Sequence, residues 1–192
     1  MPDERQRARL RETMMEAMLA AAGEQGFGAV TVEDVIARCN ANREQFYEQF
    51  SDLRDCFQAA YRDEAGRLCE GMLRAGASAA SWREGLHAAI QILVTFVVER
   101  PLIARALTID VHLAGEPAHE ARREIQERLS RAVDSGRAEI ESGYSPPPLT
   151  ALFMVSAIDA AVVTALVRGK PESFAEAAPE LEQLVATAYL GD

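Results

Sequence analysis

Apolar residues recur every three or four positions along most of the chain, which is the spacing of one face of an α-helix. In residues 7–25 the recurring positions are Leu10, Met14, Ala17, Met18 and Ala21. The same spacing, with start and stop signals, predicts further helices over residues 32–39, 42–50, 52–75, 82–99, 102–113, 118–140, 149–167 and 174–190. The pattern predicts an all-α fold, with breaks at residues 71–81 and 143–148, where glycine and proline gather.

Residues 26–61 carry the clearest local signals. Thr31 suits the N-cap of a helix, and Asn40 can adopt the left-handed conformation that a sharp helix stop needs. Asn42 can cap the next helix, in which Phe46 and Phe50 stand four apart and share one face. Two helices joined by a turn of about three residues form a helix-turn-helix, whose second helix enters the DNA major groove.

The same stretch resembles a known family, the tetracycline-repressor (TetR) type regulators of transcription. The matching motifs are Gly26-Phe27, Thr31-Val32-Glu33-Asp34-Val35, Cys39-Asn40-Ala41-Asn42, Phe46-Tyr47 and Phe50-Ser51-Asp52-Leu53-Arg54. The resemblance implies an N-terminal three-helix helix-turn-helix DNA-binding domain over residues 1–54. It also implies a C-terminal helical effector-binding and dimerisation domain over residues 55–192. Two departures are Leu53, where the family commonly has Lys, and Ala22, where it has a bulky aromatic residue.

The resemblance also implies which residues meet double-stranded operator DNA. Carried over residue by residue, the expected DNA-binding set is Thr31, Asn42, Arg43, Gln45, Tyr47, Gln49 and Arg54. Gln45 could read adenine with its amide or bind a phosphate, and Tyr47 could donate its hydroxyl to a phosphate or pack half-buried. Phe46 and Phe50 are expected to point inward.

Charge modifies this expectation. The net charge is −10, and the second helix of the motif carries Glu44 and Glu48 against the single Arg43. Because phosphates reward positive charge, we expect weak non-specific DNA binding. Four arginines precede the first expected helix core and suggest an arm for phosphates or a minor groove, or else a solvated terminus: Arg5, Arg7, Arg9 and Arg11.

The last two helices predict self-association. Residues 149–167 contain one charge, Asp159, in 19 residues. A transmembrane helix is a possible interpretation, but a central Asp opposes insertion, and a helix buried on two sides fits better. The last helix has a seam with alternating spacings of four and three, formed by Phe174, Ala178, Leu181, Val185 and Ala188. We expect a homodimer through residues 149–168 and 174–190, as an intersubunit four-helix bundle.

The helices beyond the motif are expected to enclose a pocket for a small, apolar effector. Candidate lining residues, for which ordinary core packing is the alternative, are Met72, Trp82, His87, Phe96, Thr108, His112 and Phe153. The expected mechanism is a population shift, in which the ligand favours a dimer geometry that no longer matches the DNA.

Motifs of other chemistry are absent from the sequence. The three histidines have no partner at zinc spacing, and no nucleophile elbow or phosphate-cradling glycine loop occurs, so we expect no metal, no cofactor and no enzyme. Three cysteines, an odd number, favour free thiols in a reducing compartment, and the charged N-terminus lacks a signal-peptide core. The expected location is cytoplasmic.

The sequence thus predicts a homodimeric, ligand-responsive transcriptional regulator, expected to be a repressor that its effector releases from the operator. A competing hypothesis is a helical homodimer that binds a small molecule or a protein but has a degenerate DNA reader. Glu44, Glu48 and Leu53 motivate that alternative.

Overall fold

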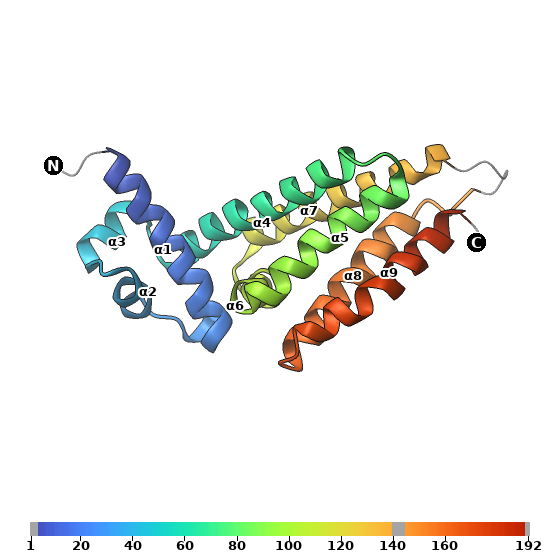
Figure 1. Ribbon diagram of the computed structural model, residues 1–192. Helices are drawn as coiled ribbons and strands as arrows, with labels where there is room; N and C mark the ends of the chain where they lie inside the picture. Colours follow the sequence, from blue (N-terminus) through green and yellow to red (C-terminus); the bar gives the residue numbers. More distant parts are fainter. Residues whose placement is uncertain (1–3, 140–144, 191–192) are drawn as a thin grey trace. The chain divides into compact units, whose positions relative to one another are not determined.

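The chain is helical throughout the part that the structure describes. The computed structural model describes residues 4–139 and 145–190, and every regular element in these ranges is an α-helix or a 3-10 helix (Figure 1). This confirms the all-α class. The chain forms two compact units: unit 1 comprises Met1–Ala65 and Leu102–Ala121, and unit 2 comprises Gly66–Pro101 and Arg122–Asp192.

Unit 1 is built around the N-terminal helices. Its elements are α1 (Glu4–Gln25), the 3-10 turn η1 (Phe27–Ala29), α2 (Val32–Cys39), α3 (Arg43–Gln49), the start of α4 (Leu53–Ala77), most of α6 (Pro101–Thr108), the 3-10 turn η2 (Asp110–Leu113) and the start of α7 (Glu116–Asp134). Its largest fully buried side chains include Phe46, Phe50, Phe57, Met14 and Met18. Residues 102–121 belong to this unit, so the grouping differs from the expected division between residues 54 and 55.

Helix α1 starts earlier than the sequence analysis placed it. We expected it from Arg7, with an arginine-rich arm before it, but residues are helical from Glu4 onward. All four arginines of the supposed arm therefore lie on a helix, where their directions are fixed by the helical turn of about 3.6 residues.

Helix α4 continues through a region that we expected to be a break. It runs to Ala77, and the non-helical linker is limited to residues 78–81. The close approach of α4 and α5 depends instead on Gly85 of α5, because a Cβ built there would stand 2.7 Å from the carbonyl oxygen of Gly76. Gly71 and Gly76 lie in the interior of α4, where a Cβ on either would make only ordinary van der Waals contacts.

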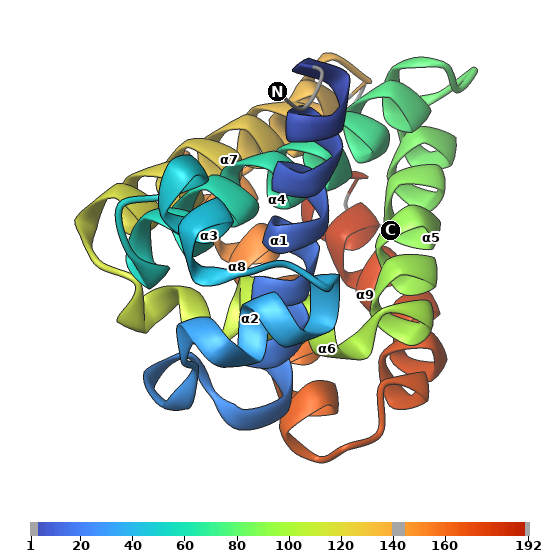
Figure 2. The same ribbon diagram turned by 90° about the vertical axis from the view of Figure 1, so that its left-hand side faces the viewer.

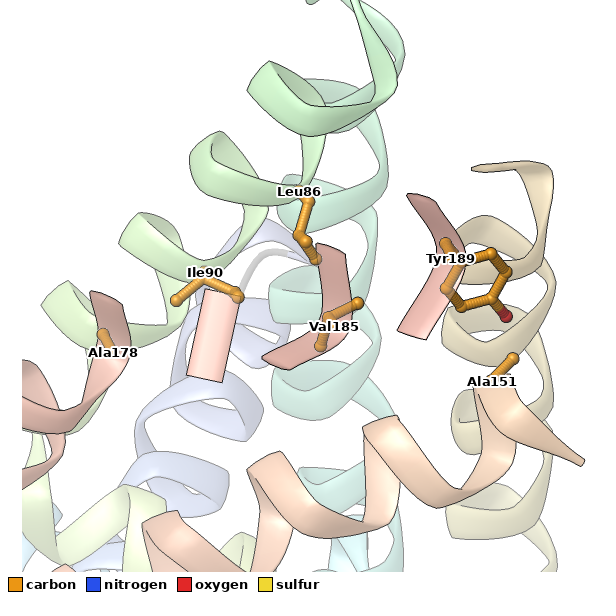
Figure 3. Packing of buried hydrophobic residues seen from close by; sticks show 6 residues of the cluster. All are labelled: Leu86, Ile90, Ala151, Ala178, Val185 and Tyr189. Atoms are coloured by element: carbon orange, nitrogen blue, oxygen red, sulfur yellow. The ribbon is translucent and has the colours of Figure 1, made fainter. Parts of the chain in front are cut away.

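Unit 2 contains the rest of α4 and α7, with α5 (Trp82–Glu99), η3 (Ser135–Glu139), α8 (Thr150–Val167) and α9 (Glu172–Leu190). Its core joins α5, α8 and α9 through Leu86, Ile90, Ala151, Ala178, Val185 and Tyr189 (Figure 3). The Tyr189 ring is fully buried while its hydroxyl donates to the Asp134 carboxylate at 2.9 Å. The indole N–H of Trp82 donates to the Val133 carbonyl at 3.0 Å.

The seam on the last helix packs inside the chain. Phe174, Ala178 and Val185 are each 1% exposed, and the latter two belong to the core shared with α5. The sequence analysis had counted this seam toward contacts between subunits. The correction follows from burial, because a side chain already covered by its own chain has no surface left for a partner.

Helix α8 remains the most apolar element. It is long and apolar enough to cross a membrane, with a mean hydropathy of 2.0 over 18 residues, of which 33% are buried. The Asp159 carboxylate in its middle pairs with Arg122 of α7 at 2.5 Å, with both side chains largely shielded from solvent. An ion pair supplied by a neighbouring helix compensates the charge that the sequence analysis found unfavourable for membrane insertion.

Candidate nucleic-acid interface

The turn between α2 and α3 is fixed by local hydrogen bonds. Thr31 and Asp34 form a capping box at the start of α2, and Asn42 and Gln45 form a second at the start of α3. Between them Asn40 has φ 51°, the left-handed conformation expected of it. Each of these bonds joins residues three apart, so the helix ends of this helix-turn-helix are fixed by neighbouring residues.

The inner face of α3 is anchored in the core of unit 1. Phe46 and Phe50 are 0% and 2% exposed, and their ring centroids lie 5.7 Å apart. Arg11 of α1 holds the end of α3: its guanidinium donates to the Gln49 carbonyl at 2.7 Å and lies 4.3 Å from the centre of the Phe50 ring. The orientation of α3 is therefore set by both stacking and a charged hydrogen bond.

The outer face of α3 is open and rich in polar groups. Tyr47 is 51% exposed, with Arg43, Glu44 and Glu48 exposed around it. The Arg43 guanidinium pairs with Glu33 of α2 at 2.5 Å. The Tyr47 hydroxyl and the Glu33 carboxylate both raise the pKa of Arg43, so this cation stays charged. Figure 2 shows α1, α2 and α3 from the side on which this face can be followed.

Several residues of the expected DNA-binding set make hydrogen bonds that stabilise the ends of α2 and α3. The Thr31 hydroxyl and the Asn42 amide oxygen accept the capping hydrogen bonds described above. The Gln45 amide oxygen accepts from the Asn42 backbone N–H at 3.0 Å. An amide oxygen has two lone pairs, so Gln45 keeps its nitrogen and one acceptor position for a base or a phosphate. Gln49 is half-buried and Arg54 is exposed.

A residue far along the sequence completes this unit. Asp110 of η2 is 3% exposed, and its Oδ1 accepts from the backbone N–H of Phe27 at 2.9 Å. This bond anchors the turn after α1, where Gly26 has φ 84°. The other carboxylate oxygen is buried, and no group in the described residues bonds it. Sequence analysis missed Asp110, because its partner lies 83 residues away and no local motif connects them.

We expect the Asp110 carboxylate to make stability pH-dependent. Burial raises the pKa of Asp110 above its ordinary value, so the folded chain binds this proton more tightly than the unfolded chain. Its contribution is fully favourable below the ordinary pKa and is lost as the pH rises through the raised one. Asp110→Asn keeps an acceptor for Phe27 but removes the charge. The unfolding free energy of this variant relative to the wild type should therefore be higher at about pH 7 than at about pH 4, near the ordinary pKa.

Urea unfolding of both proteins at each pH measures this difference, and other titrating groups cancel in the comparison. Asp110→Ala, which leaves the Phe27 N–H without its acceptor, should lose about 1–3 kcal/mol at every pH. A difference between wild type and Asp110→Asn that stays constant with pH would contradict the assignment.

The seven expected effector residues are divided between the two units. Thr108 and His112 belong to unit 1, and Met72, Trp82, His87, Phe96 and Phe153 belong to unit 2. Within unit 2, Trp82 packs on Tyr189 in the core, whereas Phe153 is 65% exposed on the surface.

A groove between α5 and α9 contains one of the seven. Its volume is about 350 Å³, and it is lined by Arg83, Glu84, Leu86, His87, Pro179, Glu182, Gln183 and Ala186. His87 Nδ1 lies 2.9 Å from the Glu182 carboxylate. Charged walls make this groove a poor fit for an apolar ligand.

Metal and thiol chemistry have little support in the described residues. Across residues 4–139 and 145–190, no group of three or more His, Cys, Asp or Glu side chains could hold a metal ion. The three cysteines are free, and burial raises the pKa of each thiol, that of Cys56 to about 12. A raised pKa disfavours the reactive thiolate.

Comparison with known proteins identifies the motif. Residues 15–60 match the family described as bacterial regulatory proteins, tetR family. A search of curated proteins finds no match.

Solved structures share the fold over nearly the whole chain. The fatty acid degradation regulator FadR from Bacillus halodurans is similar with a TM-score of 0.81 and 12% identity, covering 91% of this chain and 93% of that chain. FadR from Bacillus subtilis, solved in complex with stearoyl-CoA, has a TM-score of 0.78 and 15% identity, with 92% of this chain and 97% of that chain covered. A TetR family transcription regulator from Marinobacter aquaeolei VT8 has a TM-score of 0.75 and 21% identity, with 96% of this chain and 97% of that chain covered.

These solved structures are all described as regulators. The family match falls on the helix-turn-helix whose geometry is described above, and the fold agrees beyond it. Residues 15–60 thus carry the helix-turn-helix pattern of the tetR family of bacterial regulatory proteins, and the chain as a whole shares the fold of solved regulators of that family.

Proposed function

We propose that this regulator is a homodimeric repressor that leaves its operator when a small apolar effector binds. The observation that carries the DNA-binding part is the outer face of α3, where Tyr47 and Arg43 stand exposed on a helix fixed by two capping boxes and by buried Phe46 and Phe50. A preorganised helix of this kind suits the major groove, because little is lost in ordering it on binding.

In this proposal the seven expected residues divide by role. Arg43 and Tyr47 contact phosphates or bases directly, while Gln45 offers its amide nitrogen and Arg54 its charge. Thr31 and Asn42 hold their helix N-termini, whose backbone N–H groups favour phosphate. Gln49 presents its carbonyl to Arg11 and acts by fixing the end of α3.

The proposed dimer uses the exposed side of α8. Phe153, Ala157, Ala160, Thr164 and Val167 alternate at spacings of four and three, and all five are exposed in the single chain. This is the seam pattern of packed helices, here with small residues at its centre that allow close approach. Three more exposed apolar side chains lie nearby in the sequence or on α9: Leu149 just before α8, Leu152 on α8 and Leu184 on α9. Contiguous exposed apolar surface marks an interaction site.

An apolar effector is supported by the chemistry of unit 2 and by a relative. Met72 and Phe96 are large apolar side chains that remain half-buried, as do Leu129 and Ile158. The Bacillus subtilis FadR of similar fold was solved with stearoyl-CoA, whose acyl chain is apolar. The effector acts by preferring the dimer geometry that does not fit DNA, and equal affinity for both geometries would shift nothing.

Three substitutions on α3 test the docking. Tyr47→Phe and Arg43→Ala should each weaken binding about equally on all DNA sequences, because they remove phosphate contacts. Gln45→Ala should relax sequence preference, because a side-chain amide can bond base edges, and should also weaken the α3 cap. Fluorescence titration on matched and mismatched duplexes measures both effects, and unchanged affinity in all three variants would rule out this docking.

The alternative of a degenerate reader rests on Glu44 and Glu48, which are exposed beside Tyr47. A salt titration on the DNA upstream of the chain's own gene separates the two functions. A working reader shows specific affinity that falls steeply with salt, and a degenerate one shows none. Adding a long-chain acyl ligand to the same titration tests the effector. Release of the protein from DNA supports a repressor, and tighter binding to DNA would mean that the effector promotes DNA binding instead.

A further inference from the structure

The arginines at the start of α1 do not share one direction. Arg7 and Arg11 are four residues apart and lie on one face of the helix, whereas Arg5 and Arg9 lie about 200° around it. The Arg11 guanidinium reaches the Gln49 carbonyl and the Phe50 ring, so this face of α1 lies against the end of α3. Arg7 is therefore one helical turn further out on the face that meets α3.

Arg7 is exposed, and within the described ranges nothing pairs with its guanidinium. Its neighbour Arg11 is half-buried and engaged with α3. Figures 1 and 2 show α3 beside the N-terminal half of α1. Arg7 is therefore an exposed cation one helical turn from the contact between Arg11 and the C-terminal end of α3.

The proposed reading surface is short of positive charge. Arg43 is paired with Glu33, and Glu44 and Glu48 are exposed on the same helix. Phosphate contacts supply most of the affinity of a DNA-binding protein, so cations outside α3 are needed. A helix about 10–12 Å across fills a major groove about 12 Å wide, which places the two phosphate backbones beside it.

We propose that Arg7 binds a phosphate of the DNA backbone that flanks the groove entered by α3. This inference rests on the proposed DNA docking and adds a contact from a different helix. Arg11 is the positioning residue, because it fixes the face of α1 that carries Arg7 toward the end of α3. Arg9, with the same charge two residues away but on the opposite face, makes no such contact.

The test compares Arg7→Ala with Arg9→Ala in the full-length protein. On the upstream duplex and on an unrelated duplex, Arg7→Ala should bind about tenfold more weakly, as expected for one lost charged hydrogen bond. The slope of log affinity against log salt should fall by about 0.9, the value for one phosphate. Arg9→Ala should leave this slope unchanged, and Arg7→Lys should recover most of it.

The outcomes separate the inference from the proposed function. If the wild type binds and Arg7→Ala and Arg9→Ala lose the same DNA affinity, the helix contributes only its general positive charge, and the Arg7 contact is overturned. Wild-type binding with no change in Arg7→Ala would do the same while leaving the α3 docking intact. Absence of any salt-dependent binding by the wild type would overturn both. Circular dichroism of each variant checks that the fold is unchanged.

Discussion

Replacing Gly23 by alanine is expected to destabilise unit 1 severely. A Cβ at this position would stand 2.0 Å from the carbonyl oxygen of Leu102 and 2.6 Å from its carbonyl carbon. Both are backbone atoms, so no side-chain rotation relieves the contact, and α1 must separate from α6. Overpacking of this kind costs about 1–3 kcal/mol or more. Urea unfolding at a fixed protein concentration measures the loss, since the proposed dimer would make stability depend on concentration.

Gly66 of α4 is the matched control for this prediction. It is also a glycine inside a helix, but a Cβ there would meet no atom within 4 Å. Gly66→Ala should therefore stabilise the chain by about 0.5–1 kcal/mol, the ordinary gain of alanine over glycine in a helix. If both substitutions stabilised the protein, the close contact between α1 and α6 would not exist in solution.

Placing a charge on the exposed seam of α8 is expected to give a monomer that no longer binds the operator. Phe153 is 65% exposed in the single chain and begins the seam of four-three spacing. In the proposed dimer Phe153→Glu would bury an unpaired carboxylate, which costs several kcal/mol at each of two symmetric positions. Two half-sites can be bound at once only by a dimer, so operator affinity should fall by at least about a hundredfold with the loss of linked binding.

Sedimentation velocity and DNA titration of the same samples check this prediction. Thr95→Glu is the control, because it places the same charge on an exposed position of α5 away from the seam. It should remain dimeric and bind DNA. Phe153 was also an expected effector residue, and the experiment separates the roles. A variant that stays dimeric but loses response to an acyl ligand would assign Phe153 to the effector and contradict the interface.

The limits of the helices in the motif were predictable because their signals are local. The capping box of Thr31 with Asp34 and that of Asn42 with Gln45 each join residues three apart, and Asn40 stops α2 through its own backbone conformation. The inward direction of Phe46 and Phe50 follows from their spacing. Such features depend only on residues a few positions apart, so they can be predicted from the sequence.

The same local reading failed where a residue's role depends on a distant partner. Gly71 and Gly76 suggested a helix break, yet α4 continues through both, and Gly85 of α5 allows the close approach to the Gly76 carbonyl. The α9 seam, read as a surface for a second subunit, is covered by the chain's own core.

The sequence by itself determined the helical class and the helix-turn-helix, because helical periodicity and caps are properties of short segments. Only the tertiary structure decided that Asp110 holds the turn after α1, that Gly23 meets Leu102, and that Arg7 and Arg9 face opposite ways beside α3. These contacts join residues tens of positions apart, or depend on which helix face is covered. Nothing in a run of neighbouring residues specifies either, since both are set by how the helices pack.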